Sequence, residues 1–470
     1  MATDTNGSSR PVTKAPVQDP LSDLDGELAV DESEGADQLN GQKHEERSYA
    51  EALKTSSRDY TAEEEGNAGA SVNHIRDDRT PSNSSKPELG SGKDGSLSGG
   101  GAGLLSTAAL RFEEHDSDAR PRDGEFYEVA GIRFAPLNIP LERRLQTLAI
   151  FIHCLSIATL VSLFFFLCAI PLFWPLVIPY LVYLLSSNAA SDGSLRFRSE
   201  RLRRSRFWKL FAGYFPARLH KTEDLPATRK YIFGYHPHGI ISHGAWTAFA
   251  TEALGFSELF PGITNSLLTL DSNFRVPLYR DYVLAMGLCS VSKESIVNIL
   301  TRGGPNGEGM GRAVTIVVGG ARESLEAQPK TMRLILQERK GFIKLAVRTG
   351  ADLVPVLGFG ENDLYDQINS KTHPWMHKVQ MFVLRVWKFT LPFLHGRGIF
   401  NYDVGLMPYR RPLNIVVGAP IKVTQAPGGV VDPAEVDRLH GLYVQELQRM
   451  WDTYKDTFAQ DRKEELQILR

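Results

Sequence analysis

The chain has 470 residues and a formal net charge of −2, but this total conceals two regions of opposite charge. Residues 1–120 hold 24 acidic and 12 basic side chains, a net charge of −12, whereas the rest of the chain carries a net charge of +10. The three cysteines form no Cys-x-x-Cys pair, which argues against a disulfide framework or a zinc site.

The first 120 residues are rich in Ser, Gly, Asp and Glu and contain runs such as Gly99-Gly100-Gly101. A segment with low hydrophobicity and an excess of like charge cannot bury enough apolar surface to offset the entropy of folding. It also lacks the basic start and the apolar core of a signal peptide. We therefore predict a disordered acidic tail over residues 1–120.

The most hydrophobic stretch follows at Leu145–Leu185, where 41 consecutive residues include no Asp, Glu, Lys or Arg. A single membrane-spanning helix needs about 20 apolar residues. The stretch therefore predicts two membrane segments, Leu145–Ala169 and Leu172–Leu185, divided around Pro171. We assign residues 143–190 to a membrane-embedded hairpin; whether it spans the bilayer or re-enters the same face stays open.

Basic residues flank this hairpin on both sides. Arg143 and Arg144 precede it, and seven Lys or Arg residues lie within residues 196–209. Positive charge favours the cytosolic side of a membrane, so we expect both ends of the hairpin and the folded domain in the cytosol. We predict that residues 191–213 form a basic juxtamembrane segment that meets anionic headgroups.

From residue 214 to the C-terminus the pattern is that of an α/β domain. Four short apolar runs predict strands: Tyr231–Tyr235, Ala313–Val318, Leu353–Leu357 and Leu413–Val417. Helices are predicted between them: Gly244–Glu252, Lys293–Thr301 and Thr331–Arg348. This alternation predicts a largely parallel sheet flanked by helices.

Two further apolar segments lie in the C-terminal half. Asp432 is a good N-cap and Pro433 suits a first helical turn, and the apolar residues up to Phe458 recur every three or four positions. These features predict a C-terminal amphipathic helix that packs on the domain. Trp375–Leu394 is rich in large apolar residues, and we expect it to lie against the bilayer; the alternative is an ordinary core segment.

The chain is organised around His236-Pro237-His238-Gly239, which directly follows the predicted strand Tyr231–Tyr235. Pro237 restricts the backbone and Gly239 tolerates positive φ, so the two histidines lie on a tight turn at the end of a strand. Open α/β sheets bind their ligands at such ends, and histidine suits general-base catalysis near neutral pH. The alternative is a turn whose histidines only hydrogen-bond to the backbone.

This turn is one of a series of short blocks that occur in a fixed order along the chain. The set comprises Tyr214-Phe215-Pro216, His236–Gly239, Phe274–Asp281, Val318–Ser324, Arg339–Ala346, Val354-Pro355, Phe359-Gly360-Glu361, Gly396-Arg397-Gly398 and Gly418–Ile421. In these blocks the chain resembles the diacylglycerol acyltransferase type-2 family, which includes monoacylglycerol and wax-alcohol acyltransferases. The resemblance includes the apolar hairpin and extends over residues 143–458. The acidic tail is not part of the family core.

The resemblance implies an acyltransferase-type mixed, largely parallel sheet over residues 214–470. It implies a diacylglycerol O-acyltransferase that forms triacylglycerol from acyl-coenzyme A and 1,2-diacylglycerol. The expected location is the endoplasmic reticulum membrane, with the lipid droplet surface as a second location. Partners are then acyl-coenzyme A (a substrate, with no cofactor expected), diacylglycerol and the bilayer, without nucleic acid or metal; a homo-oligomer stays open.

Acyl transfer from a thioester to an alcohol needs a base for the hydroxyl proton and donors for the oxyanion. We assign the base to His238, with support from the resemblance, and an orienting or substrate-contacting role to His236; which of the two is the base stays open. Glu323 is the candidate for an assisting carboxylate. Its alternative role is a helix-start carboxylate stabilised by the helix dipole. No Gly-x-Ser-x-Gly pattern surrounds a nucleophile, so we expect direct transfer.

Substrate contacts are predicted at the turn itself, through Pro237 and Gly239, and at a set of cations that would hold the phosphates of coenzyme A. The cations are Arg280, Arg322, Arg339 and Lys344. Their placement rests on the matching blocks, because a single such residue more often lies on a solvated surface.

Three alternatives remain at this point. The acceptor could be monoacylglycerol or a long-chain alcohol. The chain could instead be a non-catalytic membrane or lipid-droplet anchoring protein. A metal-dependent lipid hydrolase using His236, His238 and His243 is the third, although His-Pro-His on a turn lacks the spacing of common zinc pairs.

Overall fold

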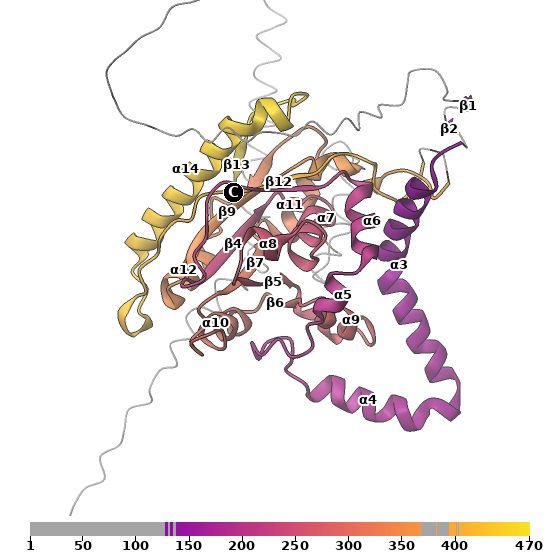
Figure 1. The fold of residues 1–470 in the computed structure, drawn as a ribbon, viewed down its shortest axis with the longest axis horizontal. Helices are drawn as coiled ribbons and strands as arrows, with labels where there is room; N and C mark the ends of the chain where they lie inside the picture. Colours follow the sequence, from indigo (N-terminus) through magenta and orange to yellow (C-terminus); the bar gives the residue numbers. More distant parts are fainter. Residues whose placement is uncertain are drawn as a thin grey trace, which may run out of the picture. The chain divides into compact units, whose positions relative to one another are not determined.

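A computed structural model describes residues 127–129, 132–134, 138–367, 382, 394–400, 402 and 404–470 of the chain. At its centre is a seven-stranded sheet with the spatial order β3-β12-β9-β4-β7-β5-β6 (Figure 1). The strands are β3 (Arg218–Lys221), β4 (Tyr231–His236), β5 (Thr264–Thr269), β6 (Cys289–Ser290), β7 (Arg312–Val317), β9 (Asp352–Phe359) and β12 (Asn414–Val417). Neighbouring strands run parallel except β9 and β12, so the sheet is mixed and mostly parallel.

The strand that precedes the histidines, β4, lies in the middle of this sheet, and all six of its residues are buried. Tyr231, Phe233 and Tyr235 enter the hydrophobic core on one face, whereas Ile232 enters the core on the other. A strand buried on both faces shows this alternation because successive side chains point to opposite sides of the sheet. The end of β4 is therefore held firmly in the centre of the domain.

Helices cover both faces of the sheet. One core is formed with α6 (Arg206–Tyr214), the π-helix Trp246–Ala250 and α9 (Tyr279–Ala285). The core on the other face is formed with α10 (Lys293–Thr301), α12 (Gly341–Thr349) and α14 (Pro433–Phe458). The shorter elements are β1 (Tyr127–Val129), β2 (Ile132–Phe134), α5 (Glu200–Arg203), α7 (His243–Ala245), α8 (Phe256–Leu259), η3 (Asp271–Arg275), α11 (Gly320–Glu326), β8 (Arg333–Ile335), η4 (Glu361–Leu364), β10 (Asp366–Gln367), β11 (Leu394–His395), η6 (Pro427–Gly429) and β13 (Gln467–Leu469).

The four predicted strands are confirmed to within two residues at each end, and α10 has the predicted bounds. The C-terminal helix α14 is also confirmed, and its N-cap Asp432 accepts a hydrogen bond from the Ala434 backbone N–H at 3.0 Å. Three strands of the central sheet were not predicted: β3, β5 and β6. β5 reads as polar because it contains Asn265, whose side-chain oxygen accepts from the Thr315 hydroxyl of β7 at 3.0 Å inside the sheet.

Two predicted helices differ from the structure. The first part of Thr331–Arg348 is the strand β8, which pairs with β13 near the C-terminus; only the part from Gly341 onwards is helical. A partner more than 130 residues away leaves no local signal in the sequence. Gly244–Glu252 is a single turn of α-helix followed by a π-helix that ends at Ala250.

The apolar stretch forms two helices, α3 (Leu141–Ala169) and α4 (Trp174–Ser186), separated by a short 3₁₀ turn at Pro171–Phe173. Among the described residues, α3 is the one helix that is long and apolar enough to cross a membrane. Its 29 residues extend about 43 Å, whereas the 13 residues of α4 extend only about 20 Å, less than the ~30 Å apolar core of a bilayer. That the two helices form a membrane hairpin stays a prediction.

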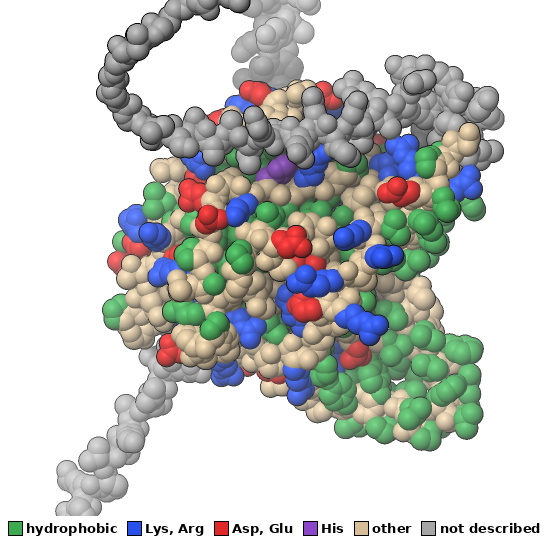
Figure 2. Space-filling model, viewed as in Figure 1, with side chains coloured by type: hydrophobic (Ala, Val, Ile, Leu, Met, Phe, Trp, Pro, Cys, Tyr) green, Lys and Arg blue, Asp and Glu red, His purple; other side chains and the backbone are tan. Residues whose placement is uncertain are grey.

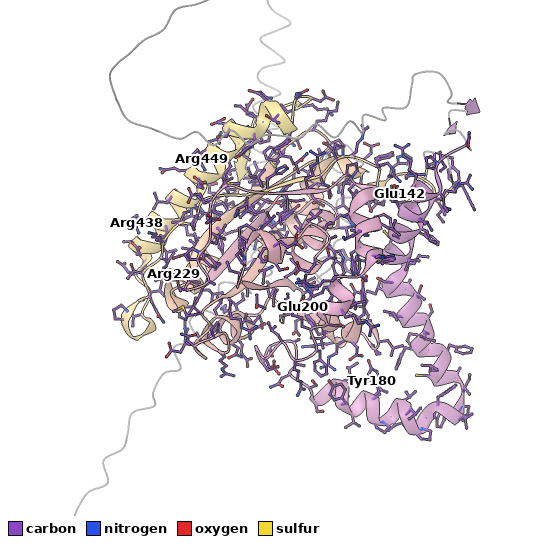
Figure 3. The ribbon with its side chains drawn as sticks, in the orientation of Figure 1. Glu142, Tyr180, Glu200, Arg229, Arg438 and Arg449 are labelled. Carbon is purple, nitrogen blue, oxygen red and sulfur yellow. The ribbon has the colours of Figure 1, made fainter. Side chains whose placement is uncertain are left out.

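These two helices project away from the sheet (Figure 1) and carry many exposed apolar side chains (Figure 2). Tyr180 of α4 ties them back to α9 (Figure 3): its hydroxyl donates to Asp281 at 2.6 Å and accepts from the Leu278 backbone N–H at 2.7 Å. The arm formed by α3 and α4 thus has a defined polar anchor at the end that returns to the domain.

Two of the seven basic residues in 196–209 serve the fold. Arg203 is fully buried and donates to Glu252 at 2.9 Å and to the backbone oxygens of Ala250 and Met286. Arg198 bonds to Glu200 and to the Asn265 backbone oxygen. The other five, Arg196, Arg201, Arg204, Arg206 and Lys209, are exposed.

Two predictions fall on parts of the chain that the structure does not describe. The acidic tail over residues 1–120 lies outside the described residues. Of Trp375–Leu394, only Phe382 and Leu394 are described, so its contact with a bilayer stays a prediction.

Candidate functional site

His236, Pro237, His238 and Gly239, here called the histidine turn, leave β4 at its C-terminal end, and the His236–Pro237 peptide bond is cis. Gly239 has a φ of +59°, a conformation that glycine adopts without strain. A Cβ atom at Gly239 would lie 2.6 Å from Cγ of Glu361, so a side chain has no room. Both backbone and packing therefore demand glycine at this position.

His238 lies half-buried on this turn, with its Nδ1 atom 3.0 Å from the backbone oxygen of Gly239. Because a carbonyl oxygen can only accept, Nδ1 carries the proton and Nε2 has a lone pair. Nε2 has no hydrogen-bond partner among the described residues. Burial lowers the pKa of His238, while its bond to Gly239 acts in the opposite direction. The neutral ring presents a free acceptor nitrogen, which is what a general base requires.

His236 has a different environment, because its side chain is completely buried. The Tyr443 hydroxyl donates to the Gly234 backbone oxygen at 3.1 Å, so its oxygen accepts from Nε2–H of His236 at 3.0 Å. Burial lowers the pKa of His236 to about 3. His236 thus joins the end of β4 to helix α14 and contacts no solvent.

Glu323 lies on α11, directly after β7 and Gly319-Gly320, and is 1% exposed. Its carboxylate accepts from the backbone N–H of His238 at 2.5 Å and from the backbone N–H of Ile335 at 2.7 Å. Burial raises the pKa of Glu323 to about 7, although both N–H bonds and the Arg339 charge oppose this rise. The structure therefore brings Glu323 to the main chain of the histidine turn and not to the imidazole of His238.

A second buried carboxylate, Glu361, lies on the other side of the turn. It begins η4 after β9 and accepts from the Tyr235 hydroxyl at 2.7 Å and from the Gly244 backbone N–H at 2.8 Å. Burial raises its pKa to about 7. Glu361 thus links the residue before the histidine turn to the helix after it. In the sequence, the block Phe359-Gly360-Glu361 at the end of a strand marked this position, but nothing there indicated a role for Glu361.

The predicted cations fall into two places. Arg322 and Lys344 are half-buried on α11 and α12, and Arg339 lies close enough to Glu323 to influence its pKa. Arg280 lies elsewhere: it is fully buried on α9, donates to the Ser187 hydroxyl at 2.6 Å and stacks over the Tyr183 ring. The contacts of Arg280 are with the end of α4, whereas none is with the histidine turn.

His243, the third histidine of the metal alternative, is buried, and its Nε2 lies 3.2 Å from the Tyr365 hydroxyl. His236, His238 and His243 therefore have three separate partners: a tyrosine of α14, a backbone oxygen and a tyrosine after η4. Within the described residues, no group of three or more His, Cys, Asp or Glu side chains is placed to hold a metal ion.

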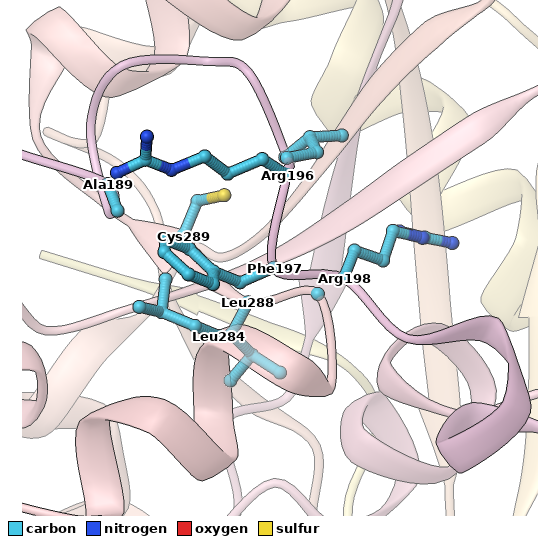
Figure 4. Close-up of a pocket in the computed structure, with 9 residues that line it drawn as sticks. Ala189, Arg196, Phe197, Arg198, Leu284, Leu288 and Cys289 are labelled. Carbon is cyan, nitrogen blue, oxygen red and sulfur yellow. The ribbon is translucent and has the colours of Figure 1, made fainter.

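A small hollow elsewhere in the domain is lined by Arg196, Phe197, Arg198 and Cys289, among others (Figure 4). Burial raises the pKa of Cys289 to about 12, so its thiol stays protonated. No residue of the histidine turn lines this hollow, and we assign no reaction to it.

Comparisons with known proteins identify the family of the chain. A family model described as diacylglycerol acyltransferase matches residues 165–469. The chain is 52% identical over 343 residues to diacylglycerol O-acyltransferase 2A of Umbelopsis ramanniana, which covers 72% of this chain and 94% of that protein. It is 41% identical to diacylglycerol O-acyltransferase 2 of Dictyostelium discoideum (72% of this chain, 99% of that protein) and 41% identical to 2-acylglycerol O-acyltransferase 1 of Bos taurus (70% and 96%).

Among solved structures, 1-acyl-sn-glycerophosphate acyltransferase from Thermotoga maritima covers 67% of this chain and 98% of its own at 12% identity, but its TM-score of 0.32 is too low to carry an argument. The sequence matches are far stronger. The family model spans more than half of the chain, and the relatives align over nearly their whole length. The chain belongs to the diacylglycerol acyltransferase family.

Proposed function

We propose that this acyltransferase transfers a fatty acyl group from acyl-coenzyme A to the free hydroxyl of 1,2-diacylglycerol and so forms triacylglycerol. Family membership and relatives named diacylglycerol O-acyltransferase support this reaction. The observation that carries the mechanism is the unpartnered Nε2 of His238, at the carboxyl end of the central strand. Ligands of α/β sheets bind at such ends.

His238 acts as the general base. Its Nε2 takes the proton of the acceptor hydroxyl while the hydroxyl oxygen forms a bond to the thioester carbonyl carbon. The tetrahedral intermediate then expels the thiolate of coenzyme A, which receives the proton from the imidazolium. Atoms and charges balance without a cofactor. His236 supports the turn through its hydrogen bond to Tyr443. It stays away from substrate because its side chain is completely buried.

Glu323 and Glu361 act as positioning residues. Glu323 fixes the main chain at His238, and Glu361 fixes the strand before the turn and the helix after it. Rigid support matters because a base that is displaced by about 1 Å loses much of its rate advantage. Pro237 and Gly239 shape the turn so that substrate can approach the ring.

The phosphates of coenzyme A bind to Arg322, Arg339 and Lys344, which lie on or next to α11 and α12, the helices on the Glu323 side of the turn. Arg offers a bidentate contact that suits phosphate. Arg280, the fourth predicted cation, contributes at most indirectly, because Ser187 and Tyr183 surround its guanidinium.

We further propose that α3 and α4 lie in the endoplasmic reticulum membrane and the catalytic domain faces the cytosol, with the lipid droplet surface as a second location. The exposed apolar side chains support this placement: Phe165 is 66%, Leu172 82% and Leu185 83% exposed. Contiguous apolar surface of this kind is rare on soluble monomers. Lys and Arg side chains lie on the face beside the apolar arm, as expected near lipid headgroups (Figure 2).

The test uses microsomes from a cell that lacks triacylglycerol synthesis and that expresses the wild type, His238→Ala or His440→Ala. Labelled oleoyl-coenzyme A is supplied with diacylglycerol, monoacylglycerol or a fatty alcohol in parallel. We expect labelled triacylglycerol from the wild type and at least a hundredfold loss in His238→Ala, because a general base contributes about 10²–10⁴ in rate. His440, a half-buried histidine on α14, is the matched control and its variant should keep its activity.

Each other outcome has a clear meaning. Full activity in His238→Ala would refute its role as the base. Product with monoacylglycerol or a fatty alcohol alone would move the acceptor to that class. No product with any acceptor from well-expressed wild type would favour the non-catalytic anchoring protein, the alternative that family membership makes less favoured.

A further inference from the structure

Helix α3 carries a histidine, His153. It lies within the apolar stretch Leu145–Leu185, which contains no Asp, Glu, Lys or Arg and no other histidine. Ionisable side chains in apolar membrane segments are costly and commonly mark functional sites. His153 faces the folded domain: its ring centroid lies 4.6 Å from that of Trp246, 4.9 Å from that of Phe211 and 6.4 Å from that of His243. The imidazole of His153 therefore lies where the arm contacts the domain.

Two polar atoms beside His153 have no hydrogen-bond partner among the described residues: Nδ1 of His243 and the Nε1–H group of Trp246. His243 is 1% exposed and Trp246 is 9% exposed. A neighbouring indole, that of Trp208, is satisfied because its Nε1–H donates to the Leu202 backbone oxygen at 3.0 Å. A buried polar group without a partner costs about 1–3 kcal/mol. Both residues lie against the His153 ring, and we read their two unpaired atoms as a sign of a ligand at this place.

The chemistry of this place suits a neutral, oxygen-bearing molecule. Trp246 offers an N–H donor, and burial lowers the pKa of His243 to about 3, so its imidazole is neutral at physiological pH. The surrounding side chains, Phe211 and Phe215, are aromatic and apolar. An ester carbonyl or a hydroxyl matches these groups, whereas the rings offer no positive charge to a phosphate.

The position of these rings relates them to both the bilayer and the catalytic turn. The outer side of α3 is apolar at this level, with Leu148 and Ile152 about half exposed. On the inner side, Ser242, which directly precedes His243, donates through its hydroxyl to the backbone oxygen of His238 at 2.7 Å. A lipid with acyl chains along α3 would thus bring its polar part toward the base.

We propose that His153, His243 and Trp246, here called the acceptor cluster, bind the glycerol backbone of diacylglycerol, with Trp246 Nε1–H donating to an ester carbonyl. This inference rests on the proposed function and adds the residues that recognise its acceptor. A neutral cluster would also disfavour phospholipids, whose charged headgroups would lose hydration without gaining an ionic partner.

The test compares two acceptors, 1,2-dioleoylglycerol and its diether analogue, which has the same chains but no ester carbonyls. The ratio of kcat/KM between them is measured in microsomes for the wild type, Trp246→Phe and Trp208→Phe. One hydrogen bond of about 1 kcal/mol corresponds to a preference of about fivefold for the ester in the wild type. Trp246→Phe keeps an aromatic ring but has no N–H, so its ratio should fall toward one while its KM for oleoyl-coenzyme A stays unchanged.

Trp208→Phe is the matched control, because it removes an indole N–H that already has a backbone partner, and it should keep the wild-type ratio. If Trp246→Phe fails to accumulate, His153→Phe on α3 replaces it, and the expected effect is a rise in KM for diacylglycerol. An unchanged ester preference in Trp246→Phe, or an unchanged KM in His153→Phe, would overturn the acceptor cluster alone. A wild type that forms no triacylglycerol would refute the proposed function itself.

Discussion

Replacement of Glu361 by Gln tests whether a neutral carboxyl group supports the histidine turn. The ordinary pKa of this side chain is 4.5, and burial raises it to about 7 in the folded protein. Because the folded state binds the proton more tightly, the contribution of Glu361 to stability is fully present below pH 4.5 and is lost as the pH rises through 7. A shift of about 2.5 units corresponds to about 3 kcal/mol.

Gln cannot ionise, yet its side-chain oxygen can still accept from the Tyr235 hydroxyl and the Gly244 N–H. The stability of Glu361→Gln relative to the wild type should therefore rise by about 3 kcal/mol between pH 4.5 and pH 8. For a domain of this size, that is a change of about 6–9 °C in the difference between the two Tm values. Thermal unfolding of the purified proteins in detergent micelles, recorded across this range, measures it.

A surface carboxylate provides a control of opposite sign. Arg438 lowers the pKa of Glu435, so the contribution of Glu435 is present at neutral pH and lost on acidification. Glu435→Gln should therefore lose a little stability relative to the wild type as the pH rises. If the Tm difference for Glu361→Gln stays flat across the range, Glu361 is ionised in the folded protein and our account of its burial is wrong.

Two further predictions concern the base and the apolar arm. Burial lowers the pKa of His238 below its ordinary value of 6.5, so kcat/KM should hold down to pH 6.5 and fall only in more acidic solution; an acid limb centred near pH 7 would instead identify Glu323 or Glu361 as the titrating group. Tyr180→Phe removes one hydroxyl that serves both Asp281 and the Leu278 N–H, and leaving these groups unpaired should lower stability by about 1–3 kcal/mol. Tyr454→Phe on α14 is its control, and equal Tm values for the two variants would show that Tyr180 does not anchor the arm.

Local patterns in the sequence predicted the central part of the fold well. The strand β4, the helix α10 and the cap of α14 each have a signal within a few residues: an apolar run, a periodic face, an Asp-Pro start. β8 was predicted as a helix, because its identity depends on pairing with β13 across most of the domain. β5 escaped prediction because its buried Asn265 reads as polar, and the hydroxyl that donates to its side-chain oxygen belongs to Thr315 of the adjacent strand.

The candidate site shows the same limit. The position of His238 at the end of a strand could be predicted, because a Pro and a Gly punctuate the chain there. The partner of Glu323 could not be predicted, because its carboxylate contacts the backbone of His238, 85 positions away in the chain. Arg280 illustrates the reverse case: its block in the sequence matches the family, but its side chain packs against α4 instead of the histidine turn.

The two histidines of the turn have different tasks because they have different hydrogen-bond partners. The Nε2–H group of His236 is used by Tyr443, whose own proton goes to Gly234 of the same strand, so His236 is locked into the core as a donor. In His238 the proton is held at Nδ1 by a backbone oxygen, and the lone pair of Nε2 stays available. Loss of the two rings should therefore have different effects. Without the imidazole at position 236, β4 would lose its hydrogen bond to α14. Without the imidazole at position 238, the fold would remain but the proton transfer would stop.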